Sequence, residues 1–341
     1  MLTLFSCPKA FEGHSAVIQR NAFESWRRLG RDVEVLVFGD DHGTAAVAKQ
    51  MDFAHFPDVA KTPFGTPLLD EIFRLATQHA RHDVLCHVNA DIVLRSDFLR
   101  AIGRIVDLFP AFLAVGQRVN LDIDTPLDFS GDWETKLARR IKTEGRVEPP
   151  DGIDFFAFTR ASGISLPPFA VGRPCWDNWL IMDAQKRGIP IVDLTRVCQI
   201  VHQNHDYSHI PGRSGKGWEG PEADANRAIA KQDAPHFAPG RYTVLSAGWV
   251  LDAKGIGRMT PLTRWRRRLY HHPRWPDERY VKVAGSGLAL PYGLLALLRR
   301  IPRGFGLRRR LRTMFDRLRR GIRPRRSTDE MRSRDRPSDP W

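Results

Sequence analysis

Cysteine is scarce in this chain of 341 residues, and the four that occur are widely separated, with no CxxC pair: Cys7, Cys86, Cys175 and Cys198. Scattered thiols of this kind are typical of small buried side chains in a reducing cytoplasm, and they argue against a disulfide framework or a structural zinc site. Also absent is any run of about 18 apolar residues, the length that a membrane span requires. The first residues lack a signal-peptide pattern, so we expect residues 2–6 to form a first strand. For the same reason we expect the protein to be cytoplasmic.

Most of the chain also lacks an excess of one charge. The formal net charge is +14, but residues 261–341 contain 23 Arg and Lys against 7 Asp and Glu, which leaves 30 basic and 32 acidic residues in the first 260. A slightly acidic body is not the broad basic surface of a nucleic-acid-binding domain. The positive charge belongs to the C-terminal extension.

What the first half does contain is an alternation of strand-like and helix-like segments. Residues 2–6, 33–38 and 112–117 are dense apolar runs, whereas residues 16–29 and 66–80 have apolar side chains at helical spacing. Near-continuous apolar strands that alternate with helices predict an α/β fold, with a mostly parallel sheet covered by helices on both faces.

The apolar run at residues 83–94 is interrupted once, by Asn89-Ala90-Asp91. A buried carboxylate is costly unless it is used or paired. If the strand keeps its pleat, Asn89 and Asp91 point to one face, where Asp91 reaches a metal-bound diphosphate and Asn89 a ribose hydroxyl. The alternative is a short turn with a solvated Asp91.

Other polar residues also follow predicted strands. Asp40 and Asp41 come directly after the strand at residues 33–38. Since ligands of parallel sheets bind beyond the carboxyl ends of the strands, we expect these two carboxylates to share one edge of the sheet with Asn89 and Asp91.

Asp177 directly precedes a predicted helix that ends near Gly188. A carboxylate at this position can cap the first helical turn, or it can face a cleft and take a proton from an acceptor hydroxyl. The flanking Trp176 and Trp179 are suited either to stacking on a sugar ring or to filling the core.

The segment at residues 202–209 contains three histidines, an Asp and a Tyr directly after a predicted strand at residues 197–201. No HxxxH spacing of a helical metal site occurs. One histidine that completes a divalent-ion site with Asp91 is one interpretation, and a polar loop with hydrogen-bonded histidines is the other.

Together, Asn89-Ala90-Asp91, the loop at Gly172, Trp176-Asp177-Asn178 and a late histidine resemble the ordered motifs of GT-A-type glycosyltransferases, across about residues 1–230. The resemblance implies a GT-A-like fold at residues 1–250, with a Rossmann-like nucleotide-binding half at 1–118 and an acceptor half at 119–250. It also implies a nucleoside-diphosphate-sugar donor, a divalent metal (Mn²⁺ or Mg²⁺) and a glycan or lipid-linked hydroxyl acceptor.

The resemblance also implies roles for individual residues. Asp177 would be the catalytic base of an inverting transfer. The remaining roles fall into three groups: donor binding by Pro8, Lys9, Asp40, Asp41, Asn89 and Asp91; sugar or acceptor contacts by Gly172, Trp176, Asn178 and Trp179; and metal binding by Asp91, His202 and His205.

The extension at residues 251–341 is rich in arginine. Segments 294–301 and 307–318 interleave leucines with arginines, which predicts basic amphipathic helices that dock on an anionic membrane surface, with the last residues disordered. Nucleic acid is a less suitable partner because few aromatic residues are placed for base stacking.

Two other functions are compatible with the sequence. A nucleotidyltransferase shares the sheet and the acidic residues, but residues 6–11 are a poor phosphate loop. A non-catalytic protein that binds membranes or nucleic acid through its basic tail would depend on residues 261–341 rather than on Asp91.

Overall fold

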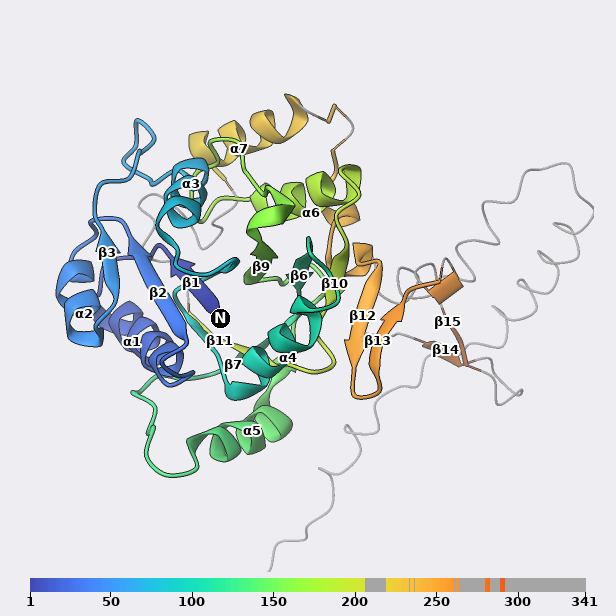
Figure 1. The fold of residues 1–341 in the computed structure, drawn as a ribbon, viewed down its shortest axis with the longest axis horizontal. Helices are drawn as coiled ribbons and strands as arrows, with labels where there is room; N and C mark the ends of the chain where they lie inside the picture. The colour runs from blue at the N-terminus through green and yellow to red at the C-terminus, as the bar shows by residue number, and fades with distance from the viewer. Residues whose placement is uncertain are drawn as a thin grey trace, which may run out of the picture. The chain divides into compact units, whose positions relative to one another are not determined.

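The computed structural model describes residues 1–205, 219–232, 234–235, 237–260, 262–263, 280–282 and 289–291. The chain divides into two compact units, Met1–Arg264 and Trp265–Trp341. The first unit is an α/β domain in which helices flank a nine-stranded sheet (Figure 1). In the second unit the described residues form one antiparallel pair, β14 (Tyr280–Lys282) and β15 (Ala289–Pro291).

The helices and strands of the first unit alternate through its N-terminal half. The large sheet contains β1 (Leu2–Ser6), β2 (Val33–Phe38), β3 (Ala54–Phe56), β4 (Val84–Val88), β6 (Leu113–Val115), β9 (Phe155–Thr159), β10 (Ile191–Asp193), β12 (Trp249–Asp252) and β13 (Gly255–Arg258). The helices are α1 (Gly13–Arg27), α2 (Thr44–Met51), α3 (Leu69–His79), α4 (Ser96–Val106), α5 (Trp133–Glu144), α6 (Trp176–Lys186) and α7 (Pro221–Gln232), with short 3₁₀ turns η1 (Arg160–Ser162), η2 (Pro239–Arg241) and η3 (Val244–Ser246).

The large sheet is mostly parallel, as the apolar strands predict. Its order is β13-β12-β10-β6-β9-β4-β1-β2-β3, and only β9 and β13 run antiparallel to their neighbours. Strand β1 lies between β2 and β4, with Phe5 opposite His87. The chain runs from β1 to β2 and β3 on one side and then crosses to β4 on the other side of β1. In parallel sheets, ligands bind beyond the carboxyl ends of the strands at such a reversal of strand order, which here lies between β1 and β4.

The two faces of the sheet pack into separate cores, because alternate strand residues point to opposite sides. Phe5, Leu36 and Phe38 pack with α3, α6 and α7, whereas Leu4 and Val35 pack with α1, α2 and α4. The result is a sheet between two helical layers, with α3, α6 and α7 in the upper part of Figure 1 and α1 and α2 at the left and lower left.

A second, four-stranded sheet was not expected from the sequence. It consists of β5 (Ile92–Val93), β11 (Ile200–Gln203), β7 (Arg118–Leu121) and β8 (Arg146–Val147), in that order. Helix α5 covers it through Leu137 and Ile141. This sheet brings β11 beside the segment that follows Asp91.

Several predicted boundaries are wrong by a few residues. Helix α1 ends at Arg27 and α3 begins at Leu69, and the strand predicted at residues 197–201 is β11, which extends through Gln203. Of the two alternatives for Asn89-Ala90-Asp91, the structure has the short turn and not the continued pleat, with the Asp91 side chain 16% exposed rather than solvated. Strand β4 ends at Val88, and a turn that closes with a 3.1 Å hydrogen bond from Ile92 N to Asn89 O separates it from β5.

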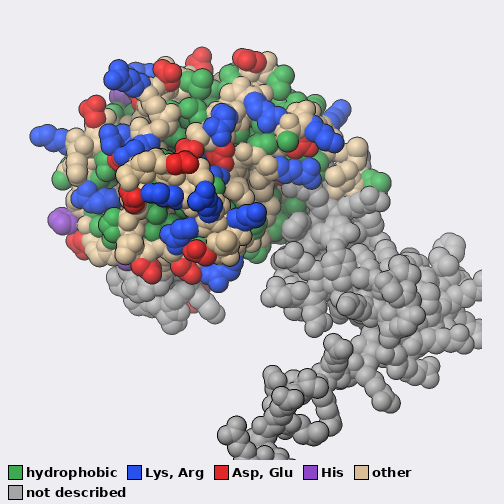
Figure 2. Space-filling model, turned by 90° about the horizontal axis from the view of Figure 1, so that it is seen from below, with side chains coloured by type: hydrophobic (Ala, Val, Ile, Leu, Met, Phe, Trp, Pro, Cys, Tyr) green, Lys and Arg blue, Asp and Glu red, His purple; other side chains and the backbone are tan. Residues whose placement is uncertain are grey.

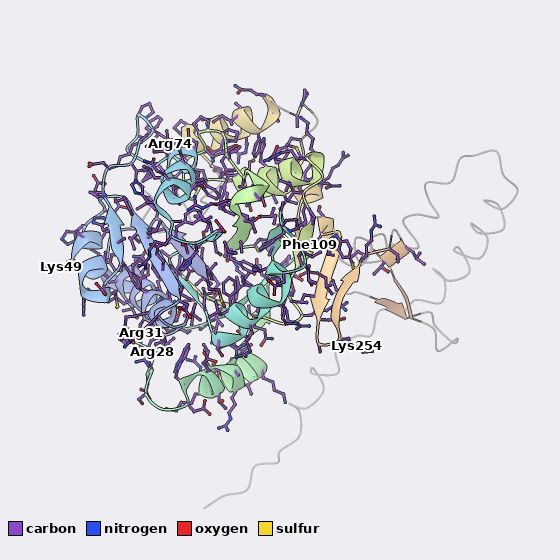
Figure 3. The ribbon with its side chains drawn as sticks, in the orientation of Figure 1. Arg28, Arg31, Lys49, Arg74, Phe109 and Lys254 are labelled. Atoms are coloured by element: carbon purple, nitrogen blue, oxygen red, sulfur yellow. The ribbon has the colours of Figure 1, made fainter. Side chains whose placement is uncertain are left out.

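The surface of the body is mixed in charge. Figure 2 shows Lys and Arg side chains interspersed with Asp and Glu over the face seen from below. Arg28, Arg31, Lys49, Arg74 and Lys254 lie on outward-facing parts of the domain (Figure 3). None of the helices in the described part of the chain is long and apolar enough to cross a membrane. The amphipathic helices predicted at 294–301 and 307–318 lie outside the described residues.

Candidate active site

A cavity of about 490 Å³ lies beyond the carboxyl ends of β1, β2 and β4, at the point where the chain connections diverge. Residues from nine separate stretches of the chain line it. The lining residues that the sequence predicted are Pro8, Lys9, Asp41, Asn89, Asp91, Gly172, Trp176, Asp177, His202 and His205. The fold therefore gathers most of the predicted residues, which span nearly 200 positions, around one space.

Asp91, His202 and His205 form a compact triad in this cavity. The Nε2 atom of His205 lies 2.9 Å from Asp91 Oδ2, and Nε2 of His202 lies 3.6 Å from the same oxygen. One ligand atom from each residue falls within 4.8 Å of the others. Burial opposes ionisation of Asp91, but the nearby His202, His205 and Lys9 outweigh it and hold the pKa of this carboxyl well below its ordinary value.

The second sheet explains why the triad forms. Strand β11 runs antiparallel to β5, with His202 opposite Ile92, so the histidine lies beside the residue that follows Asp91. His202 is thus inside β11 rather than after its strand. The buried amide of Gln203 donates to the carbonyls of Asp91 at 2.9 Å and Ile18 at 2.7 Å. On the other side, Trp26 Nε1 donates to Ile92 O at 2.9 Å, so α1 fixes the Asp91 turn.

The donor atoms of the triad suit a divalent cation. Among the described residues, Asp91 Oδ1 and His202 Nδ1 are buried polar atoms without a hydrogen-bond partner. Buried polar atoms are nearly always paired, so these two atoms are available as ligands to a cation. Two imidazoles and a carboxylate are a common donor set for first-row transition ions.

Asn89 lies in the cavity but its amide group is engaged with the protein. Its Nδ2 donates to Asp154 Oδ1 at 2.8 Å, and its backbone N–H donates to Asp154 O at 3.0 Å. Arg118 Nη1 donates to the other carboxylate oxygen of Asp154 at 2.8 Å. Asn89 and Arg118 thereby satisfy both oxygens of Asp154, and this network also fixes the turn.

Lys9 follows β1 and faces the cavity from a fixed backbone. Gln19 is buried, accepts the Lys9 N–H at 2.7 Å and donates to the Lys9 carbonyl at 2.9 Å. Burial and Arg173 lower the pKa of the Lys9 ammonium, and Asp91 only partly offsets them. Asp91 and Arg173 are both close enough to shift the pKa of Lys9. Two cationic side chains, Lys9 and Arg173, therefore line the same cavity as the triad.

The two carboxylates after β2 have different positions. Asp41 lines the cavity, and burial followed by its neighbour Asp40 raises the pKa of the Asp41 carboxyl. Asp40 is not among the lining residues. It is half-exposed and its Oδ1 lies 2.5 Å from Nζ of Lys61.

Asp177 lines the cavity from the first turn of α6. The helix begins at Trp176 with Cys175 as its N-cap, so the expectation that Asp177 directly precedes the helix is wrong by two positions, and Asp177 is the second helical residue. Burial, with smaller contributions from Asp154 and Asp151, raises the pKa of Asp177 to about 6, although backbone N–H groups of the helix start oppose the rise. A carboxyl with this pKa is suited to proton transfer near neutral pH.

The loop before α6 has two residues with positive φ. Gly172 (φ +67°) faces open space, because a Cβ placed there would meet no atom within 4 Å. Cys175 has φ 86°, which is strained for a residue with a side chain and often accompanies functional sites. The strained N-cap sets the direction of the turn that carries Asp177.

The three predicted sugar-contacting side chains on α6 divide between cavity and core. Trp176 lines the cavity and packs edge-on to His87, with ring centroids 5.1 Å apart. Trp179 is buried against Phe169, and Asn178 Nδ2 donates to Tyr242 O at 2.8 Å. Neither Trp179 nor Asn178 is among the cavity-lining residues, and both stabilise the packing of α6.

Sequence reasoning missed several charged lining residues. They are Arg118, Glu148, Asp151, Asp154 and Arg173. Most belong to irregular segments without a periodic pattern, and their positions depend on tertiary contacts. Arg173, which directly follows Gly172, is the one that the sequence could have indicated.

Comparisons with known proteins give structural similarity only. No protein-family model matches the chain, and no curated protein matches it by sequence. Among solved structures, S. aureus TarS 1-349 in complex with UDP-GlcNAc is 12% identical with a TM-score of 0.40, over 62% of this chain and 61% of that one. The chain thus matches about three fifths of that protein's length.

Structures of glucosyl-3-phosphoglycerate synthase from Mycobacterium tuberculosis are also similar. The complex with Mg²⁺ and uridine diphosphate is 14% identical with a TM-score of 0.41, over 71% of this chain and 85% of that one. The complex with phosphoglyceric acid has a TM-score of 0.43 at 14% identity, over 70% and 81% of the two chains. These similarities concern the arrangement of the backbone.

Proposed function

We propose that this protein is a GT-A-type glycosyltransferase, which moves a sugar from a nucleoside-diphosphate sugar to a hydroxyl acceptor with inversion at the anomeric carbon. The observation that carries the proposal is the pairing, in one cavity, of the Asp91–His202–His205 triad with the carboxyl of Asp177. A triad that fits a cation and a separate base are the two elements that transfer from a diphosphate requires.

Asp91, His202 and His205 would hold the divalent cation. When bound, this cation supplies positive charge against the donor diphosphate. The two imidazoles favour Mn²⁺ over Mg²⁺, because nitrogen ligands suit first-row transition ions whereas Mg²⁺ prefers oxygen. Lys9 and Arg173 add protein charge beside the same phosphates, and Asp41 at the end of β2 faces the nucleoside.

Asp177 acts on the acceptor. Its carboxylate takes the proton of the acceptor hydroxyl while that oxygen forms a bond to the anomeric carbon. The bond from this carbon to the diphosphate oxygen breaks, and its electron pair leaves with the diphosphate. A pKa of about 6 leaves Asp177 mostly ionised at neutral pH and therefore able to accept the proton.

The acceptor would bind between Trp176 and the loop at Gly172, where the open side of the glycine leaves room for a ring. We also propose that the basic segment at residues 265–341 brings the enzyme to the inner face of an anionic membrane. A lipid-linked glycan acceptor would then be presented at the membrane surface.

The test is a transfer assay on the full-length protein. UDP-, GDP-, CDP- and ADP-sugars are incubated with Mn²⁺, and release of the nucleoside diphosphate is measured with and without candidate glycan acceptors. The proposal expects turnover of one donor class, with loss in Asp91→Ala and in Asp177→Asn, and an inverted product anomer by NMR. Release of pyrophosphate from a nucleoside triphosphate instead would identify a nucleotidyltransferase.

A further inference from the structure

Helix α7 contacts two loops at the cavity through one buried carboxylate. Glu222, at the second position of α7, is 7% exposed. Its Oε2 accepts hydrogen bonds from Arg173 Nε at 2.9 Å and Nη2 at 2.6 Å. Its Oε1 accepts from Thr62 Oγ1 at 2.6 Å. One side chain therefore joins the loop before α6 to the turn before α3.

The turn at residues 62–66 presents an exposed aromatic ring at the cavity. Phe64 lines the cavity and is 66% exposed. The turn is closed by a 2.8 Å hydrogen bond from Thr62 N to Thr66 O, and Thr62 Oγ1 accepts from the N–H of Phe64 at 3.2 Å. An exposed ring on a fixed turn is well placed to stack on a flat ligand.

Arg173 is held by Glu222, but not all of its guanidinium N–H groups are used in that contact. Of its five N–H groups, two donate to Glu222 and one approaches Gly172 O at 3.4 Å. Arg173 lines the cavity and lies close enough to Lys9 to lower the pKa of that ammonium. Two cations near the triad suit the charge of a diphosphate.

Asn226 braces the same loop one helical turn further along α7. This side chain is 1% exposed, accepts from Ala170 N at 2.9 Å and donates to the carbonyls of Ala170 and Pro174 at 3.2 Å. The backbone on both sides of Arg173 is thus fixed independently of Glu222. Changes at Glu222 should therefore act on the side chains that it holds rather than unravel the loop.

We propose that Glu222 is a positioning residue of the donor site, which fixes Phe64 against the nucleobase and Arg173 against the diphosphate of one nucleotide. This inference rests on the proposed function, because it assumes that the cavity takes a nucleoside diphosphate. The residue does not touch the nucleotide itself. It acts by holding an aromatic ring and a guanidinium at fixed places along the same ligand.

The experiment compares full-length Glu222→Gln with a matched control, Glu71→Gln. Glu71 forms a similar two-bond ion pair with Arg74, at 2.8 Å for each bond, on α3 and outside the cavity lining. Arg74 is labelled in Figure 3. Dissociation constants are measured by calorimetry for UDP, GDP, CDP and ADP with Mn²⁺, and for the matching nucleosides. Melting temperatures are recorded in parallel.

Glu222→Gln is expected to weaken the preferred diphosphate by about 10- to 100-fold, the range that small displacements in a site produce, while Glu71→Gln leaves it unchanged. Two further variants separate the effect on Phe64 from the effect on Arg173. Thr62→Val removes the bond from the Phe64 turn to Glu222 Oε1 and keeps both Arg173 bonds to Oε2, so it should weaken nucleoside and diphosphate by the same factor. Arg173→Lys should weaken the diphosphate alone and should recover part of the affinity lost in Arg173→Ala.

Diphosphate affinity in Glu222→Gln equal to that of the control would overturn the inference, even with a lower melting temperature. If Glu222→Gln does not fold, the nucleoside and diphosphate affinities of Thr62→Val and Arg173→Lys are the test. Wild-type affinities in both variants would overturn the inference. A wild-type protein that binds no nucleotide overturns the proposed function and this inference together. Normal wild-type binding with an unaffected Glu222→Gln overturns the inference alone.

Discussion

Asp91 Oδ2 lies 2.9 Å from Nε2 of His205, although 114 residues separate them in the chain. The contact depends on the short strand β5, which pairs with β11 and so brings the residues that follow β11 beside the turn at Asp91. This contact in the cavity therefore joins residues that are far apart in the chain.

Replacement of Asp91 by Asn should remove metal-dependent nucleotide binding. The amide keeps the size of the side chain but loses the charge that the two histidines face, so we expect at least about a 100-fold loss of Mn²⁺ affinity. Isothermal titration with Mn²⁺ measures it, and Asp40→Asn, outside the cavity lining, is the control. Equal Mn²⁺ affinity in both variants would contradict the assignment.

Asp177→Asn should separate binding from chemistry. Loss of a general base typically slows a reaction by about 10²- to 10⁴-fold, while the variant should keep nucleotide affinity because Asp177 is not one of the three triad residues. In the wild type, kcat/KM should fall below about pH 6, as the carboxyl protonates. A profile that is flat from pH 5 to 8 would argue against Asp177 as the base.

The same variant should be more stable than the wild type at neutral pH. The folded-state pKa of Asp177 is raised, so folding penalises its ionised form. The penalty is absent below about pH 4, grows between pH 4 and 6, and is complete above pH 6. After allowance for partial exposure we expect about 1–2 kcal/mol in favour of Asp177→Asn at pH 8 and no difference at pH 3.5. Urea unfolding at the two pH values checks this, and an advantage confined to low pH would be the wrong sign.

Gln203→Leu should destabilise the domain and loosen the triad. The substitution leaves the carbonyls of Asp91 and Ile18 without their buried donor and removes the acceptor of Asn21 Nδ2. Buried polar groups without partners cost about 1–3 kcal/mol each, so thermal unfolding should reveal a loss of at least that size. Mn²⁺ affinity should fall as well. Gln50→Leu, at the exposed contact with Arg20, is the matched control and should change neither.

Removal of residues 265–341 should abolish membrane binding without loss of nucleotide binding, because Met1–Arg264 is a compact unit. Flotation with phosphatidylglycerol vesicles, with phosphatidylcholine vesicles as the control, measures the first property. Binding of the full chain should weaken as salt rises from 0.05 to 0.5 M. Vesicle binding that survives the truncation would place the membrane contact elsewhere.

The fold was largely predictable, because long apolar strands alternating with amphipathic helices specify a covered parallel sheet. The short strands were not. Ile92–Val93 and Arg146–Val147 are two residues each and have no periodicity, so the second sheet is determined by tertiary pairing alone. The reversed strand β9 has the same apolar character as its parallel neighbours, and composition does not distinguish strand direction.

The site was predictable where residue chemistry coincides with a strand or helix end, as at Lys9, Asp41, Asp91 and Asp177. Trp179 and Asn178 show the limit of that approach, since a helix start places neighbouring side chains on different faces and both of these point into packing. Arg173 and Glu222 lie 49 residues apart, and only the folded structure brings them together.

The most direct test of the account is the thermal unfolding of the full-length protein with UDP, GDP, CDP and ADP, each with and without Mn²⁺, alongside Asp91→Ala. We predict that one nucleotide raises the melting temperature by about 5–10 °C at about 100 times its dissociation constant, only with Mn²⁺ and only in the wild type. A folded protein whose melting temperature no nucleotide changes, with or without Mn²⁺, would contradict the central claim that this cavity is a nucleotide-sugar site.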